Sequence, residues 1–308
     1  QGSTGLTGAT GLTGATGFLG SHLLRKLVQL DCKVIIIKRS FSNIDRIIDL
    51  INFEQIKFHD LDKDKLEDLF KNNNVDSIIH TATEYGRIDK SISKILEANL
   101  ILPIKLIELA IKFNVTSFIN TDSYFNKDNL SYSSLLNYSL SKKVLLKWLT
   151  QLSPKIRVIN IILEHMYGPN DSQSKFIEYL IQEIGINKSK KIDLTHGHQK
   201  RDFIYVDDVV DAFATIIEHS LNNELTYSTF EIGSGKSIEV RKVVELIKKI
   251  SRSNTNLKFG EIPYRSDEIM ESKANITQIT SLGWYPKINL EDGISCILKL
   301  HPKRKNNI

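Results

Sequence analysis

Short apolar runs of strand length alternate with periodic segments of helix length through the first half of this 308-residue chain. The apolar runs lie at residues 34–37, 77–80, 117–120 and 157–163, and the helical patterns lie at residues 21–30, 61–72, 92–114 and 139–151. Strands that alternate with helices of this length form βαβ units, whose helices cover both faces of a parallel sheet. The sequence therefore predicts an α/β fold with a doubly wound parallel sheet. Pro103 is expected to kink the third helix or to mark an early turn in it.

The second half of the chain has a looser pattern. Helical periodicity returns at residues 176–185, 207–221 and 240–251 and again from residue 289, and a turn-rich stretch covers residues 262–267. We therefore expect two domains, a larger one over residues 4–166 and a smaller mixed α/β lobe over residues 167–308. The lobe is expected to return to the first domain at least once.

Composition and charge exclude several classes of protein. A net charge of +5, from 41 Lys and Arg against 36 Asp and Glu, is too small a surplus to indicate a nucleic-acid partner. No apolar run reaches the roughly 18 residues that a membrane helix needs. The first residues lack the charged-then-apolar pattern of a secretory signal, so we do not expect a secreted protein. Cys32 and Cys296 stand far apart without a CxxC pattern, which favours reduced thiols, a cytoplasmic location and no metal site.

The hexapeptide LTGATG occurs twice in succession near the N-terminus, at residues 6–11 and 12–17. Residues 1–3 have the composition of a tag remnant and are not expected to belong to the fold. One copy of the hexapeptide stands where an apolar strand is expected. It is either a sequence artefact, in which case the native first strand is missing, or a natural tandem duplication.

Three glycines spaced by three residues, Gly14, Gly17 and Gly20, lead directly into a helical pattern. Such glycines permit a tight turn and let backbone N–H groups approach a pyrophosphate, while the helix N-terminus adds partial positive charge. We interpret this segment as the dinucleotide-binding loop of a Rossmann-type sheet. Its predicted cofactor contacts are Gly14, Thr16, Gly17, Phe18 and Leu19.

The next strands end in residues that suit the rest of a dinucleotide. Lys38 and Arg39 end the strand at residues 34–37, where two cations favour the 2′-phosphate of NADP(H) over the ribose of NAD(H). The alternative interpretation is a solvated basic turn. Asp60 and Leu61 are expected near the adenine. The strand at residues 77–80 ends at the cofactor edge of the sheet, so it adds Thr81, Ala82 and Thr83 to the predicted contacts.

Tyr138 and Lys142 are four residues apart and therefore share one face of a predicted helix. An ammonium beside a phenol lowers the phenol pKa, so the tyrosine can exchange a proton with a substrate oxygen. A second polar group, Thr121 to Ser123, follows the strand at residues 117–120. Its hydroxyls are expected to orient a substrate oxygen, and the alternative is a Ser/Thr turn.

Five ordered motifs make the chain resemble the extended short-chain dehydrogenase/reductase family, also called the NAD-dependent epimerase/dehydratase family, over nearly its whole length. The motifs are residues 13–20 of the glycine loop, the Tyr138/Lys142 pair, MYGP at residues 166–169, RDFIYVDD at residues 201–208 and LGWYP at residues 282–286. The resemblance implies a nucleotide-diphosphate sugar as substrate. It also implies a homodimer formed by the helices at residues 92–114 and 139–151.

Within this family the chain is most similar to reductases that act on the 4-keto group of nucleotide-linked 6-deoxy or 3,6-dideoxy sugars for surface polysaccharides such as O-antigen. The resemblance implies Thr121, Tyr138 and Lys142 as catalytic residues, with Ser123 as the second choice to Thr121. It also implies that Tyr138 and Lys142 contact the cofactor, Lys142 at the nicotinamide ribose. It implies substrate contacts from Glu84, Ser123, His165, Arg201 and Arg265. Ser123 stands where the family's dehydratases carry a glutamate, which argues against a dehydratase.

Two other functions remain open at this stage. One is an epimerase that keeps bound NAD and returns the hydride to the same sugar, and the other is a non-catalytic relative that binds the dinucleotide. The nucleotide, the sugar and the stereochemistry of the product are not decided by the sequence.

Overall fold

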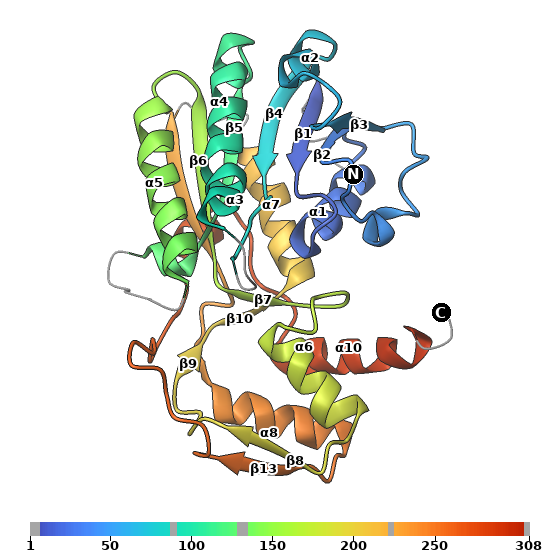
Figure 1. The fold of residues 1–308 in the computed structure, drawn as a ribbon, viewed down its shortest axis with the longest axis vertical. Helices are drawn as coiled ribbons and strands as arrows, with labels where there is room; N and C mark the ends of the chain where they lie inside the picture. Colours follow the sequence, from blue (N-terminus) through green and yellow to red (C-terminus); the bar gives the residue numbers. More distant parts are fainter. Residues whose placement is uncertain (1–6, 87–90, 128–134, 221–224, 305–308) are drawn as a thin grey trace. The chain divides into compact units, whose positions relative to one another are not determined.

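The computed structural model describes residues 7–86, 91–127, 135–220 and 225–304 of the chain. The chain divides into two compact units (Figure 1). The first unit comprises Gln1–Ile162, Val210–Phe230 and Ser281–Gly283, and the second comprises Leu163–Val209, Glu231–Thr280 and Trp284–Ile308. Within the described residues, no helix is long and apolar enough to cross a membrane.

A seven-stranded sheet organises the first unit, with the strand order β11-β6-β5-β4-β1-β2-β3. The strands are β1 (Ala9–Thr13), β2 (Val34–Lys38), β3 (Ile56–Asp60), β4 (Val75–His80), β5 (Ser117–Ser123), β6 (Arg157–Leu163) and β11 (Tyr227–Ile232). The pairs β1–β2, β2–β3, β1–β4 and β4–β5 are parallel. The order reverses between β1 and β4, which is the switch point at which doubly wound sheets bind ligands. The predicted α/β Rossmann fold is confirmed.

The central strand β1 forms from the hexapeptide repeat, so the repeat does not deprive the sheet of its first strand. Thr10 lies opposite Val34 of β2 and Ser77 of β4. A Cβ atom at Gly11 would lie 2.6 Å from Cδ1 of Ile78, which is the end of a side chain of β4 and not its backbone. The end of the first copy and the start of the second together make the strand, and the rest of the second copy makes the glycine loop.

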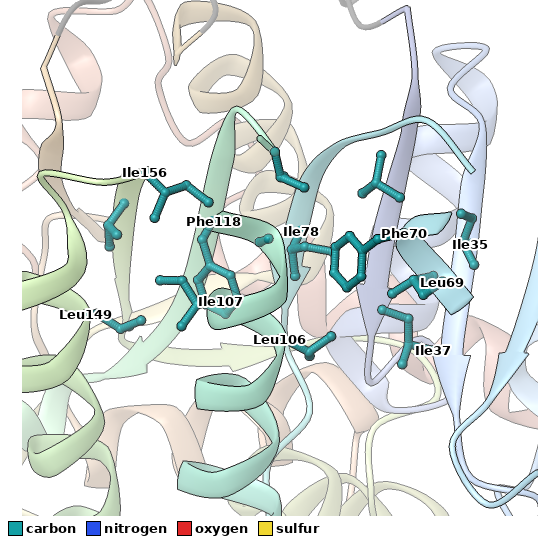
Figure 2. Packing of buried hydrophobic residues seen from close by; sticks show 14 of the residues in the cluster. Ile35, Ile37, Leu69, Phe70, Ile78, Leu106, Ile107, Phe118, Leu149 and Ile156 are labelled. Atoms are coloured by element: carbon teal, nitrogen blue, oxygen red, sulfur yellow. The ribbon is translucent and has the colours of Figure 1, made fainter. Parts of the chain in front are cut away.

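Helices cover both faces of this sheet (Figure 1). They are α1 (Phe18–Gln29), α2 (Leu66–Lys71), α3 (Ile92–Leu96), α4 (Leu102–Lys112), α5 (Leu136–Leu152) and α7 (Val206–Ser220), with short 3₁₀ turns η1 (Asp45–Ile47) and η3 (Tyr124–Asn126). On one face, Phe118 of β5 packs in a buried cluster with Leu106 of α4 and Leu149 of α5 (Figure 2). On the other, α1 and α7 are joined by a 2.7 Å ion pair between Lys26 and Asp211.

The predicted helix at residues 92–114 contains a wide turn where Pro103 was expected to disturb it. A π-helical segment, η2 (Glu97–Ile101), joins α3 to α4, and the N–H of Leu102 donates to the carbonyl of Glu97. Proline has no N–H, and its ring clashes with the carbonyl four residues before it, here that of Asn99. The wide turn avoids this clash, and Asn99 is fully buried within it.

The second unit is a mixed α/β assembly of short elements. Its strands are β7 (His165–Tyr167), β8 (Lys191–Leu194), β9 (Lys200–Arg201), β10 (Phe203–Tyr205), β12 (Ile238–Glu239) and β13 (Asn256–Phe259). They form the pairs β10-β7, β12-β9 and β13-β8. Its helices are α6 (Phe176–Leu180), η4 (Ile181–Ile186), α8 (Val240–Ser251), α9 (Thr277–Thr280) and α10 (Leu290–Arg304). Their apolar faces share one core that includes Tyr167, Ile247 and Ile297.

Two aspartates of the RDFIYVDD motif hold loops of the second unit in place. Asp202 is fully buried, and its carboxylate accepts hydrogen bonds from the N–H groups of Ser234, Gly235 and Ala274. Asp208 accepts from the N–H groups of Lys287 and Ile288, and its carbonyl accepts from the indole of Trp284. The motifs at residues 201–208 and 282–286 therefore contact each other directly.

Candidate active site

The glycine loop joins the end of β1 to the start of α1. Gly14 has a left-handed backbone conformation with φ of 71°, which favours glycine. Gly17 is the N-cap of α1, and its N–H donates to the carbonyl of Gly14 at 2.8 Å. A Cβ atom on Gly20 would lie 2.6 Å from the carbonyl carbon of Gly14, so this glycine allows the helix to pack directly against the loop.

The N-terminus of α1 suits an anionic group such as a pyrophosphate. No side chain caps the helix, and its first turn, which begins with Phe18 and Leu19, contains no acidic residue. The N–H groups of a first helical turn lack partners inside the helix, and the helix dipole places partial positive charge there. The residues present therefore fit the pyrophosphate of a dinucleotide at this position.

The end of β4 is tied to the end of β1 beside this loop. Thr13 Oγ1 accepts the N–H groups of Thr81 and Ala82, each at 3.2 Å, and Thr81 Oγ1 donates to the carbonyl of Thr13 at 2.7 Å. His80 is fully buried with Nδ1 2.9 Å from Thr13 Oγ1, and burial lowers the pKa of His80 to about 3. The histidine is therefore neutral at physiological pH, and the predicted contacts Thr81 and Ala82 are fixed next to Gly14.

The structure brings the predicted adenosine residues together at the ends of β2 and β3. The N–H of Leu61 donates to the carbonyl of Lys38 at 2.8 Å, and the guanidinium of Arg39 lies 6.0 Å from the ring centre of Phe41. The hydroxyl of Ser40 donates to the carboxylate of Asp60, which lowers the pKa of that carboxyl. The site thus combines two cations with an ionised aspartate and an exposed aromatic ring.

Tyr138 lies near the start of α5 and is buried among aromatic side chains. Its ring centre is 4.9 Å from that of Tyr85 and 6.3 Å from that of Phe125. Burial raises the pKa of Tyr138 well above 10, and a hydrogen bond with Ser123 opposes this rise. The sequence predicted a lowered phenol pKa, and the structure gives the opposite direction, because burial disfavours the phenolate.

Lys142 lies one turn further along α5 and is also buried. Its Nζ donates to the backbone carbonyl of Thr121 at 2.7 Å. Burial lowers the pKa of Lys142 to about 8, and the charge of Asp122 opposes this change. The hydroxyl of Thr121 is buried and has no hydrogen-bond partner among the described residues. Thr121, Ser123, Tyr138 and Lys142 therefore meet at the end of β5.

Asn99 is a site residue that the sequence reasoning missed. Its Nδ2 donates to the carbonyl of Glu84 at 2.8 Å and to Ser141 Oγ at 3.1 Å, and its Oδ1 accepts the N–H of Glu84 at 2.7 Å. Ser141 in turn donates to the carbonyl of Tyr138. Asn99 thus joins the loop of Thr83 and Glu84 to the helix of Tyr138. A single amide inside an apolar helical pattern was the available signal.

The remaining predicted residues lie in the second unit. Arg201 is buried, and its guanidinium forms an ion pair and a hydrogen bond with Glu268. The N–H of Glu268 also donates to the carbonyl of Arg265 at 3.2 Å. The ring of His165 has its Nδ1 3.7 Å from Glu164, and burial lowers the pKa of this histidine. Glu164 in turn accepts the hydroxyl of Ser272.

The family model for the NAD dependent epimerase/dehydratase family matches residues 11–233, which include the glycine loop, the Tyr138/Lys142 pair and the RDF segment. The chain belongs to this family. It is therefore an NAD(P)-dependent enzyme of the epimerase/dehydratase type, as the motifs predict. The resemblance stated from the sequence is confirmed.

Known members of the epimerase/dehydratase family resemble this one over nearly their whole length. The CDP-abequose synthase of Salmonella muenchen is 37% identical over 285 residues, which cover 92% of this chain and 94% of that protein. The CDP-abequose synthase of Salmonella typhimurium is 34% identical, with 91% and 94% covered. The crystal structure of the UDP-glucose 4-epimerase of Thermotoga maritima with UDP-glucose has a TM-score of 0.80 at 20% identity, and covers 96% of this chain and 99% of that one.

Proposed function

We propose that this enzyme reduces the 4-keto group of a nucleotide-linked 6-deoxy or 3,6-dideoxy hexulose with NADPH, in the synthesis of a surface-polysaccharide sugar. The observation that carries the proposal is the meeting of Thr121, Tyr138 and Lys142 at the end of β5, two strands from the β1 strand that leads into the glycine loop. The substrate class is taken from the two CDP-abequose synthases that resemble the chain over nine-tenths of its length.

Tyr138 is the proton donor in this proposal. The bound dinucleotide supplies the hydride that adds to C4 of the keto sugar. As the carbonyl bond opens, negative charge develops on its oxygen, and the hydroxyl of Tyr138 transfers its proton there. A phenol whose pKa lies above 10 is protonated at neutral pH, so the raised pKa of Tyr138 suits the reductive direction.

Lys142 and Thr121 support this proton transfer. The buried ammonium of Lys142 stabilises the phenolate that Tyr138 leaves behind, and it is protonated below its pKa of about 8. The hydroxyl of Thr121 is a buried donor without a partner among the residues described, so it suits the C4 oxygen of the sugar. Ser123 already hydrogen-bonds with Tyr138 and remains the second choice for that contact.

The preference for NADPH over NADH is also a proposal. Lys38 and Arg39 at the end of β2 supply the positive charge that a 2′-phosphate needs. Ser40 adds a hydroxyl, although its present partner is Asp60. The pyrophosphate is assigned to the turn of Gly14, Thr16 and Gly17 and the start of α1.

We assign the cofactor to the domain predicted over residues 4–166 and the nucleotide sugar mainly to the lobe over residues 167–308. Arg201 and Arg265 provide guanidinium groups for the diphosphate, and His165 adds a neutral imidazole. The guanidinium of Arg201 already forms an ion pair with Glu268. A bound phosphate would therefore share this guanidinium with the Glu268 carboxylate or displace that carboxylate from it. Glu84, Ser123 and His165 are the substrate contacts that fall within residues 4–166.

The proposal includes a homodimer and a cytoplasmic location. Large apolar side chains are exposed on α3, η2 and α5, namely Ile92, Leu96, Ile101, Leu136, Leu140 and Trp148. Water-exposed apolar side chains on neighbouring helices are typical of a surface that a second copy covers. Cys32 and Cys296 are not joined in a disulfide, which suits a reducing compartment.

The decisive experiment measures oxidation of NADPH, at 340 nm, against CDP-, dTDP-, UDP- and GDP-linked 4-keto-deoxy sugars, with NMR of each product. Reduction of one of these ketones supports the proposal. Release of NAD from the purified protein, together with interconversion of 4-hydroxyl epimers without net oxidation, would show a 4-epimerase instead. Tyr138→Phe should lower kcat by about 10²–10⁴-fold and leave the Kd for NADPH unchanged. A dinucleotide-binding protein without turnover would contradict both enzymatic functions.

A further inference from the structure

A row of buried polar side chains lies at the carboxyl end of β5 and on the neighbouring strand β6. Asn120, Asp122 and Asn160 are all buried in the first unit. Asn120 Nδ2 donates to Asn160 Oδ1 at 2.7 Å, and Asn160 Nδ2 donates to Asp122 Oδ2 at 3.1 Å. A buried polar side chain destabilises the folded protein unless it is hydrogen-bonded. The hydrogen bonds along this row therefore hold the three side chains in fixed positions.

Asp122 is the only ionisable member of this row, and it accepts hydrogen bonds from nitrogen donors. Besides Asn160, its carboxylate accepts from Asn126 Nδ2 at 2.7 Å and from the N–H of Ser123 at 2.8 Å. Three N–H donors suit a carboxylate anion, because a protonated acid would have to direct its own O–H elsewhere. Burial raises the pKa of Asp122, while these hydrogen bonds and the charge of Lys142 oppose the rise.

The carboxylate lies on the face of the sheet that α5 covers. Side chains alternate along a strand, so Asp122 shares a face with Phe118. Phe118 packs in one buried cluster with Leu145 and Leu149 of α5, and Lys142 lies one turn before Leu145 on this helix. The Nζ of Lys142 donates to the carbonyl of Thr121, whose peptide bond leads directly to Asp122.

Two titratable groups close to Lys142 carry no charge at neutral pH. His80 at the end of β4 is neutral, since its pKa is about 3, and Tyr138 on α5 is a protonated phenol. On η2 and α4, which pack beside α5, Glu97 and Lys105 form an exposed ion pair 3.9 Å apart. Asp122 is the carboxylate that opposes the effect of burial on Lys142.

We propose that Asp122 is a positioning residue for the Tyr138/Lys142 pair: its buried carboxylate fixes the end of β5 and supplies the negative charge that faces the Lys142 ammonium. Through Asn126 and the N–H of Ser123, it holds the turn that carries the hydroxyl partner of Tyr138. Through its charge, it keeps the buried lysine protonated. Asp122 itself exchanges no proton with the substrate.

The test measures the charge state of Lys142 directly, by NMR of protein labelled with ¹³C at lysine Cε. The resonance is identified by its loss in Lys142→Met, and it is titrated in wild type, Asp122→Asn and Asn120→Ala. Wild type should titrate near pH 8. Asp122→Asn should titrate about one pH unit or more lower, because a nearby opposite charge of this kind shifts a pKa by that order. Asn120→Ala disturbs the same row without removing its charge and should titrate as wild type does.

A rate measurement completes the test and separates this inference from the proposed function. If the enzyme reduces the 4-keto sugar, the loss of kcat at alkaline pH should move downward in Asp122→Asn by the shift seen in NMR. If the NMR shift occurs and no such sugar is reduced, the proposed reaction is wrong and the role of Asp122 stands. An unchanged Lys142 titration in Asp122→Asn overturns the inference. If Asp122→Asn does not fold, Asp122→Ser is measured in its place. If neither variant folds, the proposal that Asp122 keeps Lys142 protonated is also overturned.

Discussion

Substitution of Gly20 by alanine tests the loop on which the whole cofactor assignment depends. The new Cβ atom would lie 2.6 Å from the carbonyl carbon of Gly14 and 2.8 Å from Cα of Ala15, whereas an ordinary contact needs at least 3.4 Å. Both neighbours are backbone atoms, so α1 has to move away from the loop. Overpacking of this kind costs about 1–3 kcal/mol, which corresponds to a fall in Tm of roughly 2–10 °C for a chain of this size.

The same displacement moves the first N–H groups of α1 away from the position proposed for the pyrophosphate. Each charge-assisted hydrogen bond contributes about 1.5–3 kcal/mol, so loss of one should weaken NADPH binding by roughly 10- to 100-fold. Kd is measured by the fluorescence of bound NADPH and Tm by calorimetry. Gly11→Ala in strand β1 is the matched glycine-to-alanine control. Its Cβ atom meets only the flexible ends of Ile78 and Ile37, so Kd should not change. Unchanged Kd and Tm in Gly20→Ala would refute the assignment of the loop.

Three further predictions concern the cofactor, the core and the dimer. Arg39→Ala should raise KM for NADPH by about 10-fold or more and leave KM for NADH nearly unchanged, because only NADPH has a 2′-phosphate; equal effects on both would contradict that role. Phe118→Ala should lower the free energy of unfolding in urea by about 3–5 kcal/mol, since Phe118 is fully buried, whereas the exposed Phe41→Ala should change it by less than about 0.5 kcal/mol. Trp148→Glu should convert the dimer to a monomer in light scattering, and a monomeric wild type would disprove that interface.

Local patterns in the sequence were sufficient for most of the fold. The strand predicted at residues 157–163 is β6, and the helix predicted at residues 240–251 is α8, because apolar periodicity depends only on neighbours in the chain. The helix predicted at residues 61–72 begins only at Leu66. A turn at residues 60–64 explains the later start of the helix. The carboxylate of Asp64 accepts the N–H of Asp60, and the carbonyl of Asp60 accepts the N–H of Lys63.

Only part of the candidate site could be predicted from the sequence, because several of its contacts join residues that are far apart in the chain. Tyr138 and Lys142 lie on adjacent turns of one helix, so their spacing in the sequence was enough to predict that they share a face. Asn99 contacts Ser141 across 42 residues, and Asp122 contacts Asn160 across 38, so no local pattern predicts either pair. The raised pKa of Tyr138 likewise depends on burial beside Tyr85, which only the folded chain shows.

The tandem hexapeptide that forms β1 has an unusual consequence for the register of the central strand. Side chains alternate between the two faces of a sheet with a period of two residues. A shift of the chain by six residues, an even number, would therefore keep every position of β1 on the same face. Residues 4–7 and 10–13 both read TGLT, so such a shift would change little within the strand itself. What distinguishes the two registers is the segment after Gly17, where Phe18, Leu19 and Gly20 begin α1. The helix, and not the strand, therefore sets which copy enters the sheet, and deletion of one hexapeptide should leave the same strand, loop and helix in place.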